Sequence, residues 1–240
     1  MSPTRRAALL AGLLYFSTHL TSVAAVAVYG SAVTDPNYFR AGGSATPVLV
    51  GAVLELALAL GVLGTGVVLL PYLTPYGPAS ARAFSAMRTM EAAVIAVGTL
   101  PMLALVRLQP AASDVTGESA LIGTSMVALH QAAFLVGQGL IISVNTLVLA
   151  ALLRRSQMVP QWIGTLGLVG GTLVLSGNLL QLFGVIAKAG TWAGLFAVPV
   201  FAFEISFAGY LVFRGLRAPA RMSGGPRGAA RINSAVLGTE

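Results

Sequence analysis

Six long apolar segments dominate the sequence, and short polar connections separate them. Each segment is long enough for a helix to cross a bilayer core, which takes about 20 predominantly apolar residues. The segments are continuous and rich in leucine, alanine and glycine, without the two-residue alternation of membrane-barrel strands. We therefore predict an all-α bundle of six transmembrane helices, approximately at Ala7–Gly30, Pro47–Leu70, Phe84–Val106, Met126–Leu153, Trp162–Ile186 and Ala193–Phe213.

The connections between these segments carry turn-forming residues, such as those at Asp35-Pro36-Asn37, Thr74–Pro78 and Gln109-Pro110. After Gly215 the composition changes, because residues 216–240 hold glycine, proline and arginine but little that could pack. We expect one membrane domain over residues 1–215 and a basic, disordered tail over residues 216–240.

Arginine and lysine are distributed unevenly between the two sides of the predicted bundle. If the first helix starts in the cytoplasm, that side receives Arg5, Arg6, Arg82, Arg154, Arg155, Arg214, Arg217, Arg221, Arg227 and Arg231. The other side receives Arg40, Arg107 and Lys188. Because cytoplasmic loops carry the excess of basic residues, this bias predicts that both termini are cytoplasmic. We expect a multi-pass protein of a bacterial cytoplasmic membrane.

The first segment has a second interpretation. Arg5-Arg6, the apolar run that follows and Ala25-Val26-Ala27 resemble a signal peptide with a small-residue cleavage site. Cleavage would leave five helices. The apolar run is long enough to span a membrane, which favours a retained helix.

Composition supports a membrane protein and excludes several other classes. Apolar residues make up 56% of the chain and charged residues only 9%, whereas soluble domains are about 25% charged. The chain has no cysteine, which excludes disulfide scaffolds, thiolate enzymes and iron–sulfur sites. The net charge of +7 arises from the flanks and loops of the segments, so we expect membrane lipids and no nucleic acid as partners.

Three of the seven acidic residues, Glu55, Glu91 and Glu204, lie inside apolar segments. A charged, unpaired side chain there costs about 2.5–3.5 kcal/mol or more on insertion, so each needs a partner. At 1.5 Å per residue all three fall in the middle third of the membrane, and we expect them to line one cavity. Their potential counter-charges are Arg88, His19 and His130. One arginine is too few for three carboxylates, so we expect one or two glutamates to be protonated at neutral pH.

Polar amides recur on two of the predicted helices. Gln131, Gln138 and Asn145 are seven residues apart, which places them along nearly one helix face. Asn178 and Gln181 follow on the fifth segment. Such amides act as hydrogen-bonding contacts between helices or as ligand-binding groups.

Other kinds of chemistry fit the sequence less well. His19 and His130 differ by about 14 Å in predicted depth, which disfavours a haem held between them. Zinc sites use three or four protein ligands, and the chain has only two histidines. No nucleophile elbow or phosphate-binding glycine loop is present. We therefore assign no catalytic residues, no metal site and no cofactor.

Several short motifs, in this order and spacing, resemble a family of bacterial multi-pass membrane proteins, domain-of-unknown-function family 4386. They are Gly12–His19, Gly51–Glu55, Gly64–Pro71, Arg88–Ala92, Leu129–Gly137, Arg155–Pro160, Gly164–Gly171 and Phe203-Glu204 near Arg214-Gly215. In that family an acidic residue often follows the histidine of the fourth helix and a proline lies in its glycine cluster. Here those places hold Gln131 and Gln138, which argues against a histidine–carboxylate pair there. The resemblance implies a six-helix membrane protein without an established activity.

Three functions remain open at this stage. We favour a non-catalytic membrane module that binds a lipid or a partner through a buried polar cluster. The alternative is a small proton- or cation-linked transporter that uses Glu55, Glu91 and Glu204. The third is an intramembrane enzyme acting on a lipid or quinone, with glutamate and histidine as acid and base. A small ligand or cation inside the bundle is compatible with the first two.

Overall fold

The computed structural model describes residues 1–35, 37–38, 41–108, 117–187 and 190–217. These residues form helices and no strands. The helices are α1 (Pro3–Tyr29), α2 (Ala45–Leu73), α3 (Pro78–Gly98), α4 (Leu100–Leu108), α5 (Gly117–Phe134), α6 (Ile142–Ser156), α7 (Gln161–Leu182) and α8 (Thr191–Phe213).

Six helical spans of the described chain are long and apolar enough to cross a membrane. Four of them contain α1, α2, α7 or α8, and the other two join α3 to α4 and α5 to α6. The prediction of an all-α bundle with six transmembrane helices is therefore confirmed.

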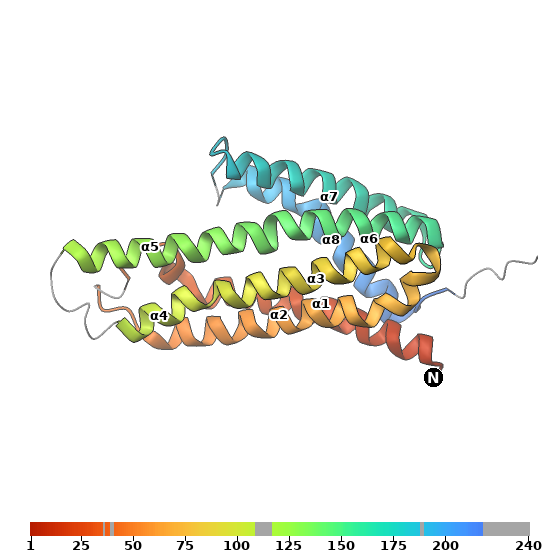
Figure 1. Ribbon diagram of the computed structural model, residues 1–240, viewed down its shortest axis with the longest axis horizontal. Coiled ribbons are helices and arrows are strands. Elements are labelled where there is room, and N and C mark those ends of the chain that lie inside the picture. Colours follow the sequence, from red (N-terminus) through yellow and green to blue (C-terminus); the bar gives the residue numbers. More distant parts are fainter. Residues whose placement is uncertain (36, 39–40, 109–116, 188–189, 218–240) are drawn as a thin grey trace, which may run out of the picture.

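The six spans close into a ring. Going around it, α1 packs on α2, α2 on α3, α3 on α6, α6 on α7, α7 on α8 and α8 again on α1. The α7–α8 pair is shorter than the long spans and reaches less far toward the end of the bundle where α4 and α5 meet (Figure 1). We call this the far end. The arginine end is the opposite one, where α1 and α3 begin and α6 ends.

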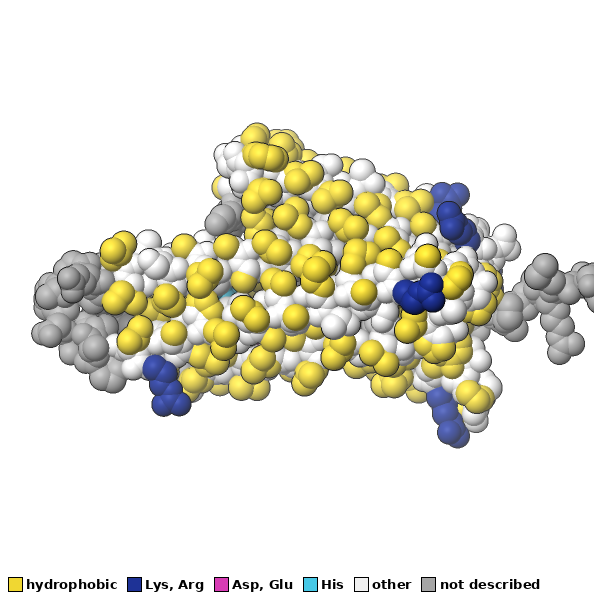
Figure 2. Space-filling view, in the orientation of Figure 1, with side chains coloured by type: hydrophobic (Ala, Val, Ile, Leu, Met, Phe, Trp, Pro, Cys, Tyr) yellow, Lys and Arg dark blue, Asp and Glu magenta, His cyan; other side chains and the backbone are white. Residues whose placement is uncertain are grey.

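The surface of the bundle has the polarity expected of a protein in lipid. On the face in Figure 2, hydrophobic side chains cover the middle and basic side chains lie toward the ends. Leu20 and Leu60, for example, are 72% and 70% exposed. At the arginine end, the Arg5 guanidinium of α1 donates hydrogen bonds to the last-turn carbonyls of Leu211 and Val212 in α8, which satisfies groups that a helix end leaves free.

Some sequence predictions fall outside the described residues. They concern Arg40, Lys188, the Gln109-Pro110 connection and most of the predicted tail, residues 218–240.

Glycines set the contact between α7 and α8. A Cβ atom at Gly170 would lie 2.8 Å from the Val200 nitrogen and 2.9 Å from the Pro199 carbonyl oxygen. A Cβ atom at Gly167 would lie 2.8 Å from the Phe203 ring. The two backbones can approach this closely only because α7 has no side chains at these positions.

Two of the long spans deviate from a regular α-helix, and both deviations affect the interior. The third span breaks at Thr99, because Pro101 has no N–H to continue the α-helical ladder. The Met102 N–H bonds to the Thr99 carbonyl at 3.1 Å, three residues back, so the Gly98 carbonyl is free for another donor.

The fourth span contains a π-helical segment, Leu135–Ile141, between α5 and α6. Such segments often mark functional sites, because they change the faces on which side chains lie.

Candidate functional site

The three membrane-embedded glutamates lie in two separate places. Glu91 and Glu204 line a small cavity of about 220 Å³, together with Arg88 and His19. Glu55 lines a different cavity of about 550 Å³. The expectation of one cavity shared by all three is therefore wrong. Neighbouring helices direct the side chains to different partners.

The first place is the Arg88 cluster, which we define as Arg88, Glu91, Glu204, His19, Tyr15 and Asn145. The Arg88 guanidinium lies between two carboxylates, with Nη1 3.4 Å from Glu91 Oε2 and Nη2 3.4 Å from Glu204 Oε1. Nη2 also donates to the Tyr15 hydroxyl at 2.8 Å. The Arg88 and Glu91 side chains are only 3% and 1% exposed, so this ion pair is shielded from solvent and lipid.

Four helices hold the Arg88 cluster together. The guanidinium lies 5.0 Å from the centre of the Tyr15 ring of α1, in a cation–π arrangement. The Asn145 amide of α6 donates to Glu91 Oε2. On α2, a Cβ atom at Gly66 would lie 2.8 Å from the Arg88 Cβ, so the glycine leaves room for the arginine. With Glu204 from α8 and Arg88 from α3, the cluster connects α1, α3, α6 and α8.

His19 extends the cluster through α1. Its Nδ1 lies 2.8 Å from the Tyr15 carbonyl oxygen, and its Nε2 lies 3.3 Å from Glu204 Oε2. A carbonyl oxygen can only accept, so Nδ1 must carry a hydrogen. The contact between Nε2 and the carboxylate then needs one further proton, carried either by the imidazole or by the glutamate.

The second site, around Glu55, also has a histidine whose ring joins a backbone carbonyl to a glutamate. His130 Nδ1 donates to the Gly98 carbonyl, which the helix break has freed, at 2.9 Å. His130 Nε2 lies 3.5 Å from Glu55 Oε1. The Tyr29 hydroxyl donates to Glu55 Oε2 at 2.9 Å. We call Glu55 and His130 the Glu55 pair, and it too needs one proton between the imidazole and the carboxylate.

These contacts balance the buried charge. Arg88 and Glu91 cancel, and each histidine–glutamate pair is neutral when it holds one shared proton. The carboxylate partner of His130 comes from α2 rather than from a neighbouring residue of α5, so the absence of an acid at Gln131 does not prevent a pair. Which atom of each pair carries the proton, and so whether a glutamate is protonated, stays a prediction.

The polar amides divide between the two places. Gln131 and Gln138 line the large cavity, whereas Asn145 belongs to the Arg88 cluster. Gln138 lies on the π-helical segment and lines both cavities. The Ser22 hydroxyl of α1 donates to Gln138 Oε1 at 3.1 Å. Gln138 of the π-helical segment and Ala197 of α8 therefore line both cavities.

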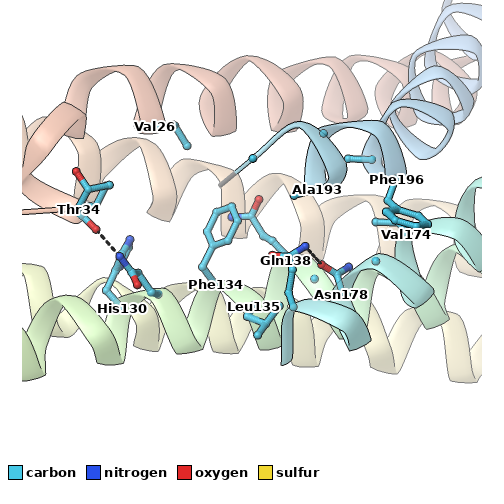
Figure 3. A pocket seen from close by; sticks show the side chains of 18 of the residues that line it. Val26, Thr34, His130, Phe134, Leu135, Gln138, Val174, Asn178, Ala193 and Phe196 are labelled. Carbon is cyan, nitrogen blue, oxygen red and sulfur yellow. Dashed lines mark hydrogen bonds between the residues drawn. The ribbon is translucent and has the colours of Figure 1, made fainter. Parts of the chain in front are cut away.

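Asn178 and Gln181 also lie at the large cavity. The Asn178 amide donates to the Ser143 hydroxyl at 3.3 Å, and the Gln181 amide donates to Asn178 Oδ1 at 3.4 Å. Figure 3 shows Asn178, Gln138 and Phe134 around the cavity. These amides thus connect helices and also present polar atoms to the cavity.

The large cavity lies toward the far end, between α1, α5, α7 and α8, with Glu55 of α2 on its wall. Its described lining is mostly apolar or aromatic and includes Tyr29, Phe134 and Phe196. Glu55 and His130 are the only Asp, Glu, Lys, Arg or His side chains of that lining.

Tyr15 and Tyr29 were not predicted from the sequence as site residues. Tyr15 precedes His19 by one helical turn, and this spacing was a usable signal. Tyr29 had no such signal, because an aromatic residue near the end of a span is common at membrane interfaces. Within the described residues, no group of three His, Cys, Asp or Glu side chains could hold a metal ion.

Comparison with known proteins identifies the family. The model of a family described as "Domain of unknown function (DUF4386)" matches residues 10–215. No curated protein and no solved structure matches the chain. The family match covers both sites and all six spans apart from the first seven residues of the first, so the chain belongs to the DUF4386 family, as its motifs predicted.

Proposed function

We propose that this membrane protein is a non-catalytic binding protein for an amphiphilic small molecule, which occupies the large cavity beside the Glu55 pair. The cavity itself is the observation that carries this proposal. Its volume of about 550 Å³ falls in the usual range for small-molecule sites, which are mostly apolar with a few well-placed polar groups. We place the protein in the cytoplasmic membrane of a bacterium, with the arginine end in the cytoplasm.

The arrangement of the cavity suggests how such a ligand lies. Its apolar part packs against Phe134, Phe196 and Val174, and its polar end lies near Glu55 and His130. The amides of Gln138 and Asn178 offer further hydrogen-bonding atoms along the way. A molecule with one polar end and a hydrophobic body matches this distribution better than a fully polar solute.

A pair of glycine variants on α8 tests the proposal. Gly194 lines the cavity, and a Cβ atom there would meet no atom within 4 Å. Gly194→Leu therefore adds bulk at the cavity from a position where the Cβ atom itself has free space. Gly209 on the same helix has equally free space but does not line the cavity, so Gly209→Leu is the matched control.

The measurement is native mass spectrometry of the purified protein with mono-oleoylglycerol, a neutral amphiphile. We expect one bound molecule in the wild type and in Gly209→Leu. We expect affinity to fall at least about tenfold, or 1.4 kcal/mol, in Gly194→Leu. Equal binding by both leucine variants would show that the cavity is not the binding site.

A proton-linked transporter is a second candidate, and one observation favours it. A histidine–glutamate pair lies in each of the two cavities, and the hydrogen bond between Ser22 and Gln138 lies between them. Polar and ionisable groups arranged in this way inside a membrane are typical of proton pathways. This candidate predicts proton uptake into proteoliposomes that is lost in Glu55→Gln.

A further inference from the structure

We infer that the large cavity selects lipophilic cations, and that a bound cation replaces the proton shared by Glu55 and His130. This inference rests on the proposed function and adds the charge class of the ligand and its dependence on pH. It comes from the charges on the cavity lining and from the hydrogen-bond count of the Glu55 pair.

The lining is suited to a cation and not to an anion. Among the described residues that line the cavity, Glu55 is the only acid and there is no lysine or arginine. A phosphate or carboxylate ligand would therefore lie beside a carboxylate, and the described lining offers it no lysine or arginine. Tyr29, Phe134 and Phe196 present aromatic rings to the same space, and ring faces attract cations.

Among the described residues, no lysine or arginine contacts Glu55. The titratable groups that contact it are the Tyr29 hydroxyl of α1 and the His130 imidazole of α5. The third span contributes a backbone group, the Gly98 carbonyl, which accepts a hydrogen bond from His130 Nδ1. Glu204, by contrast, contacts Arg88 as well as His19. Glu55 therefore depends on a removable positive charge, which is either a proton or a ligand.

The exchange balances in charge. Before binding, Glu55 and His130 together hold one shared proton and are neutral. When a monovalent cation enters, that proton leaves, His130 stays neutral with its hydrogen on Nδ1, and the Glu55 carboxylate faces the cation. One positive charge enters and one leaves, so the membrane interior never holds an unpaired charge, which would be costly there.

The experiment compares tetraphenylphosphonium with tetraphenylborate, two ions of nearly equal size and shape but opposite charge. Binding to the purified wild type is measured by calorimetry in two buffers that differ in ionisation enthalpy, which reports the protons released. We expect the phosphonium to bind and release about one proton. We also expect its affinity to fall about tenfold for each unit that the pH decreases while the pair is protonated. We expect the borate not to bind.

Glu55→Gln removes the exchangeable proton while keeping the pair connected. The amide nitrogen of glutamine can donate to His130 Nε2, and its oxygen can accept from the Tyr29 hydroxyl. Both contacts of residue 55 are therefore kept as hydrogen bonds. We expect this variant to lose phosphonium binding. Glu91→Gln removes a buried carboxylate that does not line the large cavity and leaves Arg88 its contact with Glu204, so it is the matched control and its folded form should bind the phosphonium like the wild type.

Each outcome has a clear meaning. Equal binding of the borate, absence of proton release, or phosphonium binding retained in Glu55→Gln would overturn the inference. The wild-type comparison of the two ions decides the question even if Glu55→Gln does not fold. If one of these results is found while mono-oleoylglycerol binds and Gly194→Leu blocks that binding, the inference fails but the proposed function stands. If Gly194→Leu blocks no ligand, the proposed function itself fails.

Discussion

Replacing Arg88 with methionine would test the charge balance of the Arg88 cluster. Methionine has a comparable unbranched stem but no charge, so the variant removes the only guanidinium between Glu91 and Glu204. Among the described residues Glu91 then contacts no cation, and its remaining polar partner is the Asn145 amide. Glu204 keeps His19.

The expected loss is large because the group is buried. Breaking a buried ion pair by removing one partner costs about 3–5 kcal/mol, since it leaves a charge without compensation. Arg88 is 3% exposed and also loses its hydrogen bond to Tyr15, which favours the upper part of that range. Arg82 on the same helix is exposed, so Arg82→Met should change the free energy of unfolding by no more than about 0.5 kcal/mol.

A second substitution should restore much of the stability. In Arg88→Met/Glu91→Gln, the carboxylate left without a partner is gone and the cluster is again neutral. We expect the double variant to be more stable than Arg88→Met alone, with a coupling free energy of about 2–3 kcal/mol. Arg88→Met/Glu204→Gln should gain much less, because Glu91 still lacks a cation.

The assay is equilibrium unfolding in mixed micelles, followed by circular dichroism, with the wild type and each variant at neutral pH. The reasoning would be refuted if Arg82→Met cost as much as Arg88→Met, since burial would then not matter. It would also be refuted if the Glu204→Gln double variant recovered as much stability as the Glu91→Gln double variant, because the pairing assigned here would then be incorrect.

Two further predictions concern packing and orientation. Gly170→Ala should destabilise the bundle by about 1–3 kcal/mol, because the new methyl group meets the α8 backbone. In the control Gly209→Ala the methyl group has free space, so the thermal unfolding temperature should stay nearly unchanged. The chain has no cysteine, so a cysteine introduced by Ser31→Cys or Arg155→Cys can be labelled selectively. An impermeant thiol reagent added outside intact cells should label the Ser31→Cys variant and not the Arg155→Cys variant. The reverse pattern would contradict cytoplasmic termini.

The number of spans could be predicted from the sequence because it follows from composition and segment length alone. Lipid requires each segment to satisfy its own backbone, and a run of about 20 apolar residues leaves the helix as the one solution. The break at Thr99 was harder to predict. Pro101 was visible, but its consequence, a free Gly98 carbonyl that orients His130, depends on which helix packs opposite.

The pairing of the buried groups could not be read from local patterns. Depth placed Glu55, Glu91 and Glu204 near one another, but depth says nothing about the direction in which each side chain points. A seven-residue repeat predicted that Gln131, Gln138 and Asn145 would share a face. The π-helical segment between them changes the register, so the repeat serves two sites instead of one.

Counting charges constrains the interior more than any motif does. Three carboxylates, one guanidinium and two imidazoles are neutral when two further protons are bound, and this sum was available from the sequence. The structure shows that the two histidine–glutamate pairs that hold these protons have different charged neighbours. The one shared by His19 and Glu204 lies near Arg88, a permanent cation that stays when the proton leaves. The one at Glu55 has no such cation among its described neighbours, and a cavity large enough for a ligand opens beside it. We therefore expect a positive charge at Glu55 in every state, supplied either by the proton or by a ligand in the cavity.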